Sequence, residues 1–387
     1  MQVYRRGDSG PAIAEIRDKL TRLGLLEPAE ADVYDDALDR AVRTFQQRRG
    51  LRIDGVVGPE TYRALDEARW RLGDRTLSHT VNHPYVGDDV AALQQRLLDL
   101  GFDPGRCDGI FGIRTAAALR DFQRNVGLAA DGILGPTTLG ALGRLRRTVT
   151  GGSPSAQREE EQLRRGSGSL SGRVVVLDPG HGGDDLGACA HDLAEAELAL
   201  DLALRIEGRL GALGVETFLT RGETTCPTDE ERARFANETE ADLLLSLHTD
   251  AALSAGPRGV ASYFYGTGPD PAAGPNHAAS AAGSDRVVRS AVGERLAQLV
   301  QNEIVARTDL LDCRIHSKTW QLLRMTRMPA VRIDVGYVTN ARDAARLGTA
   351  EFRDAVAEAV VAAVQRLYLP PDRDIATGQF RMPALAR

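Results

Sequence analysis

The sequence predicts an α/β protein in which a helix-flanked, mostly parallel sheet is preceded by two small three-helix domains. Two patterns indicate this arrangement. A helical pattern occurs twice in the first part of the chain, and strands alternate with amphipathic helices in the last part, after a polar stretch. At 387 residues the chain is also too long for one ordinary core, so several domains are expected.

The N-terminal part contains a duplicated helical unit. Phe45 and Phe122 stand 77 residues apart, and so do Leu65 and Leu142. A constant offset over many positions indicates an internal duplication. The other matched pairs are Leu20/Leu97, Leu23/Leu100, Gly24/Gly101, Gln46/Gln123, Gly50/Gly127, Leu51/Leu128, Asp54/Asp131, Gly55/Gly132, Gly58/Gly135, Pro59/Pro136 and Thr61/Thr138.

The helices of one unit can be predicted from spacing and from start and stop signals. Ile13, Ile16 and Leu20 recur at intervals of three and four residues, so they share one helix face. Gly24 suits a left-handed cap at the end of that helix. Pro59 suits the first position of a short third helix.

The duplicated pattern resembles the three-helix peptidoglycan-binding domain type 1 of bacterial and phage cell-wall hydrolases, over about residues 7–68 and 84–145. The resemblance implies peptidoglycan or muropeptide precursors as partners. Most of the matching residues would serve the core and turns with or without a ligand. Repeat one has Asp32–Asp35 where repeat two has Gly109 and Gly112, so its sequence supports a ligand groove less well.

Changes in composition predict the domain boundaries. A stretch rich in Gly, Ser, Glu and Arg separates the repeats from the α/β part and is predicted to be a mobile linker. Two prolines open the C-terminal tail, which is predicted to be extended and exposed. The expected segments are repeat one at 1–70, repeat two at 80–148, the linker at 149–172, the α/β domain at 173–369 and the tail at 370–387.

Short apolar runs and amphipathic segments alternate in the α/β domain, as expected for a mostly parallel sheet flanked by helices. Leu198, Leu202 and Ile206 share one helix face and are expected to point inward. Strands are predicted at 173–177, 215–220, 241–248 and 330–335, and helices at 194–213, 229–239, 288–307 and 351–367.

Three residues of this domain carry metal-binding chemistry. His181 lies in a glycine-rich loop after a strand, Glu195 opens a helix, and His248 closes an apolar run. Two histidines and one carboxylate at strand and helix ends form a donor set typical of catalytic zinc with one open position. Considered singly, each residue also has an explanation that needs no metal. A histidine after a strand is usually a polar loop residue, and a glutamate at the start of a helix usually interacts with the helix dipole. Glu197 competes with Glu195 for the carboxylate role.

The order of these residues resembles the amidase-3 family of zinc amidases, over about residues 173–368. In that family the residues that match His181, Glu195 and His248 bind zinc, which implies the same roles here. Ala199 stands where the family usually has asparagine. The stretches that carry the resemblance are Asp178-Pro179-Gly180-His181-Gly182-Gly183, Leu219-Thr220-Arg221, Glu231-Arg232-Ala233, Ala236-Asn237, Ala241-Asp242 and Ser246-Leu247-His248.

The resemblance also implies a general base. The family takes it from a glutamate in a stretch that here reads Pro329–Asn340, and Asp334 occupies the glutamate position. Zinc would lower the pKa of bound water toward about 7, and the carboxylate would carry the proton to the leaving amine of L-alanine. Aspartate withdraws the carboxylate by about 1 Å, a misplacement that can cost about 10²-fold in rate. A competent metal site with a weakened base is therefore expected.

A second function class fits the same residues: an amidase-like regulator with little or no catalysis. The whole chain resembles the actinobacterial CwlM group, through Gly151–Pro154, Thr326–Pro329, Asp334-x-Gly-Tyr and Arg366–Leu369. Members of that group act in the cytoplasm, where phosphorylation by a Ser/Thr kinase lets them stimulate the first committed enzyme of peptidoglycan precursor synthesis. This implies a phosphorylation site at Thr377 in the tail. A non-catalytic peptidoglycan-binding protein is a third alternative, but it leaves the donor set unexplained.

Composition narrows the partners and the compartment. A net charge of −6 and a pI near 5.8 argue against nucleic acid, and no stretch reaches the roughly 20 apolar residues that span a bilayer. The start Met1–Asp8 lacks the apolar segment of a secretory signal, so a cytoplasmic location is expected. The four cysteines are far apart in the sequence, which favours isolated buried thiols over disulfides or a thiolate zinc site.

Overall fold

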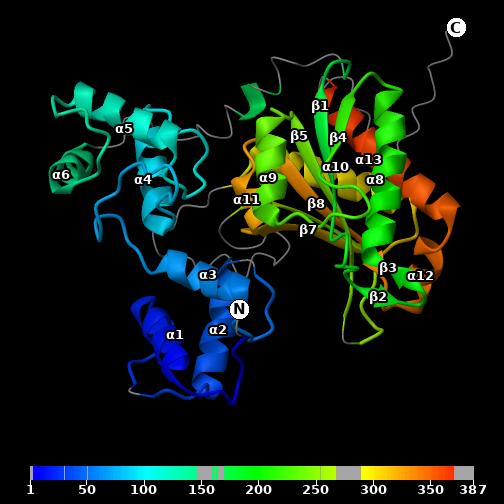
Figure 1. Ribbon diagram of the computed structural model, residues 1–387, viewed down its shortest axis with the longest axis horizontal. Helices are drawn as coiled ribbons and strands as arrows, with labels where there is room; N and C mark the ends of the chain where they lie inside the picture. Colours follow the sequence, from blue (N-terminus) through cyan, green and yellow to red (C-terminus); the bar gives the residue numbers. More distant parts are fainter. Residues whose placement is uncertain are drawn as a thin grey trace, which may run out of the picture. The chain divides into compact units, whose positions relative to one another are not determined.

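In the computed structural model the chain forms two compact units, Met1–Gln157 and Arg158–Arg387 (Figure 1). No helix in the described part of the chain is long and apolar enough to cross a membrane. The described residues are 3–29, 31–49, 51–145, 159–161, 163, 170–252, 254–266 and 289–369.

The first unit contains two three-helix repeats, each with its own core. Leu20 and Leu65 are fully buried in the first core, and their counterparts Leu97 and Leu142 are buried in the second. Each core contains twelve buried hydrophobic residues among those the structure describes. Burying one of the larger side chains contributes about 1.5–3 kcal/mol, so these residues together stabilise each small repeat. The helices are α1 (Pro11–Arg22), α2 (Asp36–Arg49), α3 (Pro59–Ala68), α4 (Asp88–Asp99), α5 (Ile113–Asn125) and α6 (Pro136–Arg144).

The predicted helix boundaries of repeat one are confirmed. Gly24 has a φ of 68°, and the amide of Leu25 donates to the carbonyl of Leu20 at 3.0 Å, which closes the end of α1. Pro59 occupies the first turn of α3.

A buried glutamine ties each Asp–Gly turn to the helices around it. Gln94 Nε2 donates to Asp108 Oδ1 at 2.9 Å, to the carbonyl of Ile110 at 3.0 Å and to Thr115 Oγ1 at 3.1 Å, while its Oε1 accepts from the amide of Gly109 at 2.8 Å. One side chain thereby satisfies a turn that would otherwise bury unpaired polar groups. The same four contacts surround Gln46 (Asp54, Val56, Thr61, Gly55) and Gln123 (Asp131, Ile133, Thr138, Gly132).

The second unit is built on a six-stranded mixed sheet of order β4-β1-β5-β8-β6-β7. All neighbouring strands are parallel except β6 and β8, which are antiparallel. The strands are β1 (Val174–Pro179), β4 (Glu216–Leu219), β5 (Leu243–Asp250), β6 (Val260–Tyr265), β7 (Asp312–Lys318) and β8 (Ala330–Tyr337); a separate short hairpin pairs β2 (Cys189–Ala190) with β3 (Leu193–Ala194).

Helices cover both faces of this sheet (Figure 1). Alternate residues of β5 and β8, such as Leu245 and Val331, enter the larger core beneath α8, α10 and α13, and Leu244 and Ala330 enter a smaller core with α9 and α11. The helices are α8 (Glu195–Gly211), α9 (Asp229–Glu238), α10 (Ala291–Arg307), α11 (Gln321–Met325), α12 (Ala341–Leu347) and α13 (Ala350–Tyr368).

Several expectations need correction. Strands β6 and β7 were not predicted, although they complete the sheet and supply its antiparallel pair. The cysteines are free, but only Cys107 is buried: Cys189 and Cys226 are exposed and Cys313 is partly exposed. Most of the linker at 149–172 and the whole tail, with Thr377, lie outside the described residues.

Candidate metal centre

The three predicted metal ligands come from three different elements and meet at one place. His181 follows β1, Glu195 is the first residue of α8, and His248 lies on β5. One ligand atom from each lies within 4.8 Å of the other two. Glu197, the competing carboxylate, is exposed and is not part of this group.

Glu195 is the centre of the cluster. Its Oε1 lies 2.8 Å from His248 Nδ1, and its Oε2 lies 3.2 Å from His181 Nε2. The backbone amide of Ala188 donates to Oε2 at 3.0 Å, and that of Thr249 to Oε1 at 3.2 Å. Burial alone would raise the pKa of Glu195, but the bonds with both histidines outweigh it and lower that pKa, so the group is a carboxylate.

Asp185 fixes the orientation of the His181 ring. Its Oδ2 lies 2.8 Å from His181 Nδ1, and its Oδ1 accepts from the amide of Gly187 at 3.0 Å. A proton on Nδ1, donated to Asp185, would leave the lone pair of Nε2 for a metal ion, which is the tautomer that a metal ligand needs. The bond with Glu195 raises the pKa of His181, against the opposing effect of burial.

Two glycines leave the room that the cluster occupies. A Cβ atom on Gly180 would stand 2.1 Å from the His248 ring. One on Gly187, whose φ is +66°, would stand 2.7 Å from the His181 ring and 2.8 Å from Glu195 Oε2. Any larger residue at either position would displace the side chains of the cluster.

A buried ion pair holds the loop that carries His181. Asp178 accepts from Arg232 Nη1 at 2.7 Å, and Arg232 Nη2 donates to the carbonyl of His181 at 2.8 Å. Arg221 donates to the carbonyls of Gly180 at 2.7 Å and of Pro179 at 2.8 Å. Because His181 has a left-handed φ of 58°, its conformation depends on this support.

Asp334 lies beside the cluster, on the strand next to His248. The register of β5 and β8 pairs these two residues, and Asp334 is only 5% exposed. Both of its oxygens accept from Arg332, Oδ1 from Nε at 2.7 Å and Oδ2 from Nη2 at 3.3 Å. Sequence reasoning placed Asp334 but missed Arg332, which the alternation of β8 puts on the same side of the sheet.

Further charged and aromatic side chains surround this pair. The Arg332 guanidinium lies over the Trp320 ring at 4.7 Å, and Tyr263 of β6 lies 4.7 Å from the same ring. Burial, and then the charge of Asp334, raise the pKa of Asp250. Asp250 was also missed, although it stands two residues after His248 and so on the same side of β5.

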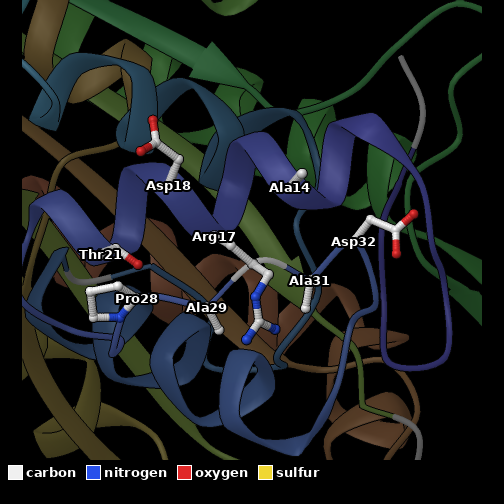
Figure 2. Close-up of a pocket in the computed structure, with 8 residues that line it drawn as sticks. All are labelled: Ala14, Arg17, Asp18, Thr21, Pro28, Ala29, Ala31 and Asp32. Carbon is white, nitrogen blue, oxygen red and sulfur yellow. The ribbon is translucent and has the colours of Figure 1, made fainter.

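The first unit contains a cavity of about 630 Å³ in repeat one (Figure 2). Arg17 replaces the buried glutamine of the other networks there, and its Nη1 donates to the carbonyl of Val33 at 3.2 Å and to Asp35 Oδ1 at 3.0 Å. Repeat one thus has a cavity among its described residues, although the loss of both glycines made its sequence support a ligand groove less well. The cavity is lined by Ala14, Arg17, Asp18, Thr21, Pro28, Ala29, Ala31 and Asp32.

Comparison with known proteins assigns both units. The N-acetylmuramoyl-L-alanine amidase family matches residues 175–366, and the peptidoglycan binding domain family matches residues 9–65 and 86–142. The chain is 47% identical to N-acetylmuramoyl-L-alanine amidase CwlM of Mycobacterium tuberculosis, over 98% of this chain and 93% of that protein. The chain belongs to the N-acetylmuramoyl-L-alanine amidase family.

Other relatives match the second half of the chain. Amidase LytC of Bacillus subtilis is 30% identical over 49% of this chain and 34% of its own length. The crystal structure of an N-acetylmuramoyl-L-alanine amidase from Clostridium difficile 630 is 25% identical and covers 51% of this chain and 96% of that one, with a TM-score of 0.43.

Proposed function

We propose that the chain is a zinc-dependent amidase that hydrolyses the bond between N-acetylmuramic acid and L-alanine in peptidoglycan or its precursors. The observation that carries this proposal is the convergence of His181, Glu195 and His248. Membership in the amidase family and the two peptidoglycan-binding repeats support the choice of substrate.

The residues of the cluster fit a zinc ion. Two imidazoles and a carboxylate are its usual ligands at catalytic sites, the His181 tautomer is set by Asp185, and glycines leave room around the donor atoms. His181 Nε2, Glu195 and His248 Nδ1 would hold the ion. When bound, zinc supplies Lewis-acid chemistry, which polarises the scissile carbonyl and lowers the pKa of a water to about 7.

Asp334 is the residue that we assign to proton transfer. Its carboxylate takes a proton from the attacking water as the new carbon–oxygen bond forms. The same proton then passes to the nitrogen of L-alanine as the carbon–nitrogen bond breaks. The position of Asp334 opposite His248 supports this role, because the reacting atoms must lie close to the metal ligands.

Metal content and peptide release test this function together. The purified full-length chain should bind one zinc ion and release stem peptides from cell walls, and His181→Ala should lose both properties. His79→Ala, which removes an exposed histidine of the first unit, is the matched control. Stoichiometric zinc in His181→Ala would exclude this ligand set, and a zinc-loaded wild type that releases nothing would exclude the activity.

We propose a second candidate function, a cytoplasmic regulator of peptidoglycan precursor synthesis with little or no catalysis. The observation that favours it is the engagement of both Asp334 oxygens by Arg332. In this case a Ser/Thr kinase would phosphorylate Thr377, and the modified tail would bind the first enzyme of precursor synthesis. A phosphate adds about −1.5 to −2 charge, enough to create a site for arginine side chains on a partner.

Cell-based measurements test the regulatory function. Mass spectrometry of protein from growing cells should detect phosphate on Thr377, and Thr377→Ala should impair wall synthesis while His181→Ala does not. An unmodified Thr377, or normal wall synthesis with Thr377→Ala, would contradict this function.

A further inference from the structure

We propose that Arg332 is a positioning residue that withholds Asp334 from proton transfer, so that it acts as a built-in brake on the amidase. The inference rests on the proposed amidase function, in which Asp334 takes the proton. It adds a second cause to the weakened activity that the shortened carboxylate of Asp334 leads us to expect.

The strand geometry brings the two side chains together. Arg332 and Asp334 are two residues apart on β8, so both project from the same side of the sheet. Each oxygen of Asp334 accepts one hydrogen bond from the Arg332 guanidinium. Such charge-assisted paired bonds are stronger than neutral ones. They weaken when the carboxylate accepts a proton and loses its charge, so the pairing opposes proton transfer to Asp334.

The surroundings keep the pair closed. The Asp334 side chain is 6% exposed and that of Arg332 is 28% exposed, so little water reaches the carboxylate to replace the guanidinium. The Trp320 ring lies against the guanidinium at 4.7 Å, and Tyr263 packs on Trp320. An arginine does not release its own proton near neutral pH, so the pair opens only if the side chain moves.

A different role for Arg332 predicts the opposite result. A guanidinium beside the metal ligands could stabilise the negative charge that develops on the scissile carbonyl oxygen. Removal of Arg332 would then slow the reaction, whereas removal of a brake accelerates it. The sign of the change in turnover therefore separates the two roles.

The experiment compares Arg332→Leu with wild type in zinc-loaded, full-length protein. We expect kcat for muropeptide cleavage to rise about tenfold to a hundredfold, the range that hydrogen bonds to a charged group are worth, with KM unchanged. Arg332→Gln provides a second variant if Arg332→Leu folds poorly. Arg342→Leu is the control, because Arg342 is exposed and its side chain makes no hydrogen bond or ion pair among the described residues. A lower kcat in both Arg332 variants would overturn the proposal.

A double-mutant cycle tests whether Arg332 acts through Asp334. In an Asp334→Asn background, Arg332→Leu should no longer raise kcat. A gain of the same size in that background would overturn the brake. If zinc-loaded wild type and Arg332→Leu both release no peptide, the amidase function itself fails, whereas an active wild type with a slower Arg332→Leu overturns only the role of Arg332.

Tryptophan fluorescence provides a readout that does not depend on activity or metal. Trp70 and Trp320 are the two tryptophans of the chain, so Trp70→Phe leaves Trp320 as the only reporter. In this background Asp334→Asn should shift the Trp320 emission, because it frees the guanidinium that lies on the ring. The same change should have no effect once Arg332 is leucine. If Asp334→Asn leaves the Trp320 emission unchanged in both backgrounds, the proposed coupling between Arg332 and Asp334 is overturned.

Discussion

Asp185 offers a test of the metal centre that leaves every proposed ligand in place. Replacing it by asparagine keeps the size of the side chain and an oxygen for the amide of Gly187, but removes the negative charge next to His181 Nδ1. That charge orients the ring and makes its other nitrogen a better donor. We therefore expect Asp185→Asn to weaken zinc binding without unfolding the protein.

The size of the effect can be worked out from the contact. Loss of a hydrogen-bond partner behind a metal ligand typically costs about 10- to 100-fold in affinity. The bond to His181 is 2.8 Å long, but the Asp185 side chain is 53% exposed, so water can take over part of its role. The expected change therefore lies at the lower end, about tenfold in Kd, or about 1.4 kcal/mol.

Competition with a chromophoric zinc chelator at fixed pH measures this change. Asp184→Asn is the matched control, because it removes the same charge from the neighbouring exposed residue, whose side chain makes no hydrogen bond or ion pair within the described part of the chain. The reasoning is refuted if the two variants bind zinc equally well. It is also refuted if Asp185→Asn binds more tightly than wild type.

Three further predictions follow from the site and its support. Asp334→Glu should raise turnover by up to about 10²-fold, measured as muropeptide release, and an unchanged rate would mean that the pocket is shaped for aspartate. Gly187→Ala should weaken zinc binding, because its Cβ atom would stand 2.8 Å from Glu195 Oε2, whereas Gly208→Ala should not. Asp178→Asn should cost about 3–5 kcal/mol in a denaturant titration, because Arg232 loses its buried counter-charge. Burial favours a raised pKa for Asp178, but Arg232 and two hydroxyls lower it overall, so this stabilisation should be full above about pH 4 and fade as the pH falls further.

Much of the fold could be predicted because its signals are local. The two repeats could be predicted because the same residues recur at one constant offset. The start of α8 could be predicted because Glu195 precedes a leucine-rich helix face. Strand β7 gave no such signal, because it lies at the edge of the sheet and reads Asp-Cys-Arg-Ile-His-Ser-Lys, with few apolar residues. Edge strands are often polar, so composition does not distinguish them from loops.

The site was predictable only in part, because only some of its residues have a signal in the local sequence. His181, Glu195 and His248 each occupy a recognisable position at the end of an element. The contacts that support them depend on side-chain direction across the sheet, which needs the strand register. Alternation along β8 could have placed Arg332 beside Asp334, but the stacking of Arg332 on Trp320 could not be found without the fold.

The three glutamine networks of the first unit make it a convenient object for protein engineering. Each network consists of the same few residues: one glutamine, an Asp–Gly turn and a threonine in the first turn of the following helix. Repeat one lacks a fourth copy because Arg17, Ala31, Asp32 and Leu38 stand where repeat two has Gln94, Asp108, Gly109 and Thr115. Arg17→Gln, Ala31→Asp, Asp32→Gly and Leu38→Thr together would give repeat one the residues of the missing network, so that both repeats would carry the same pair of hydrogen-bonded turns.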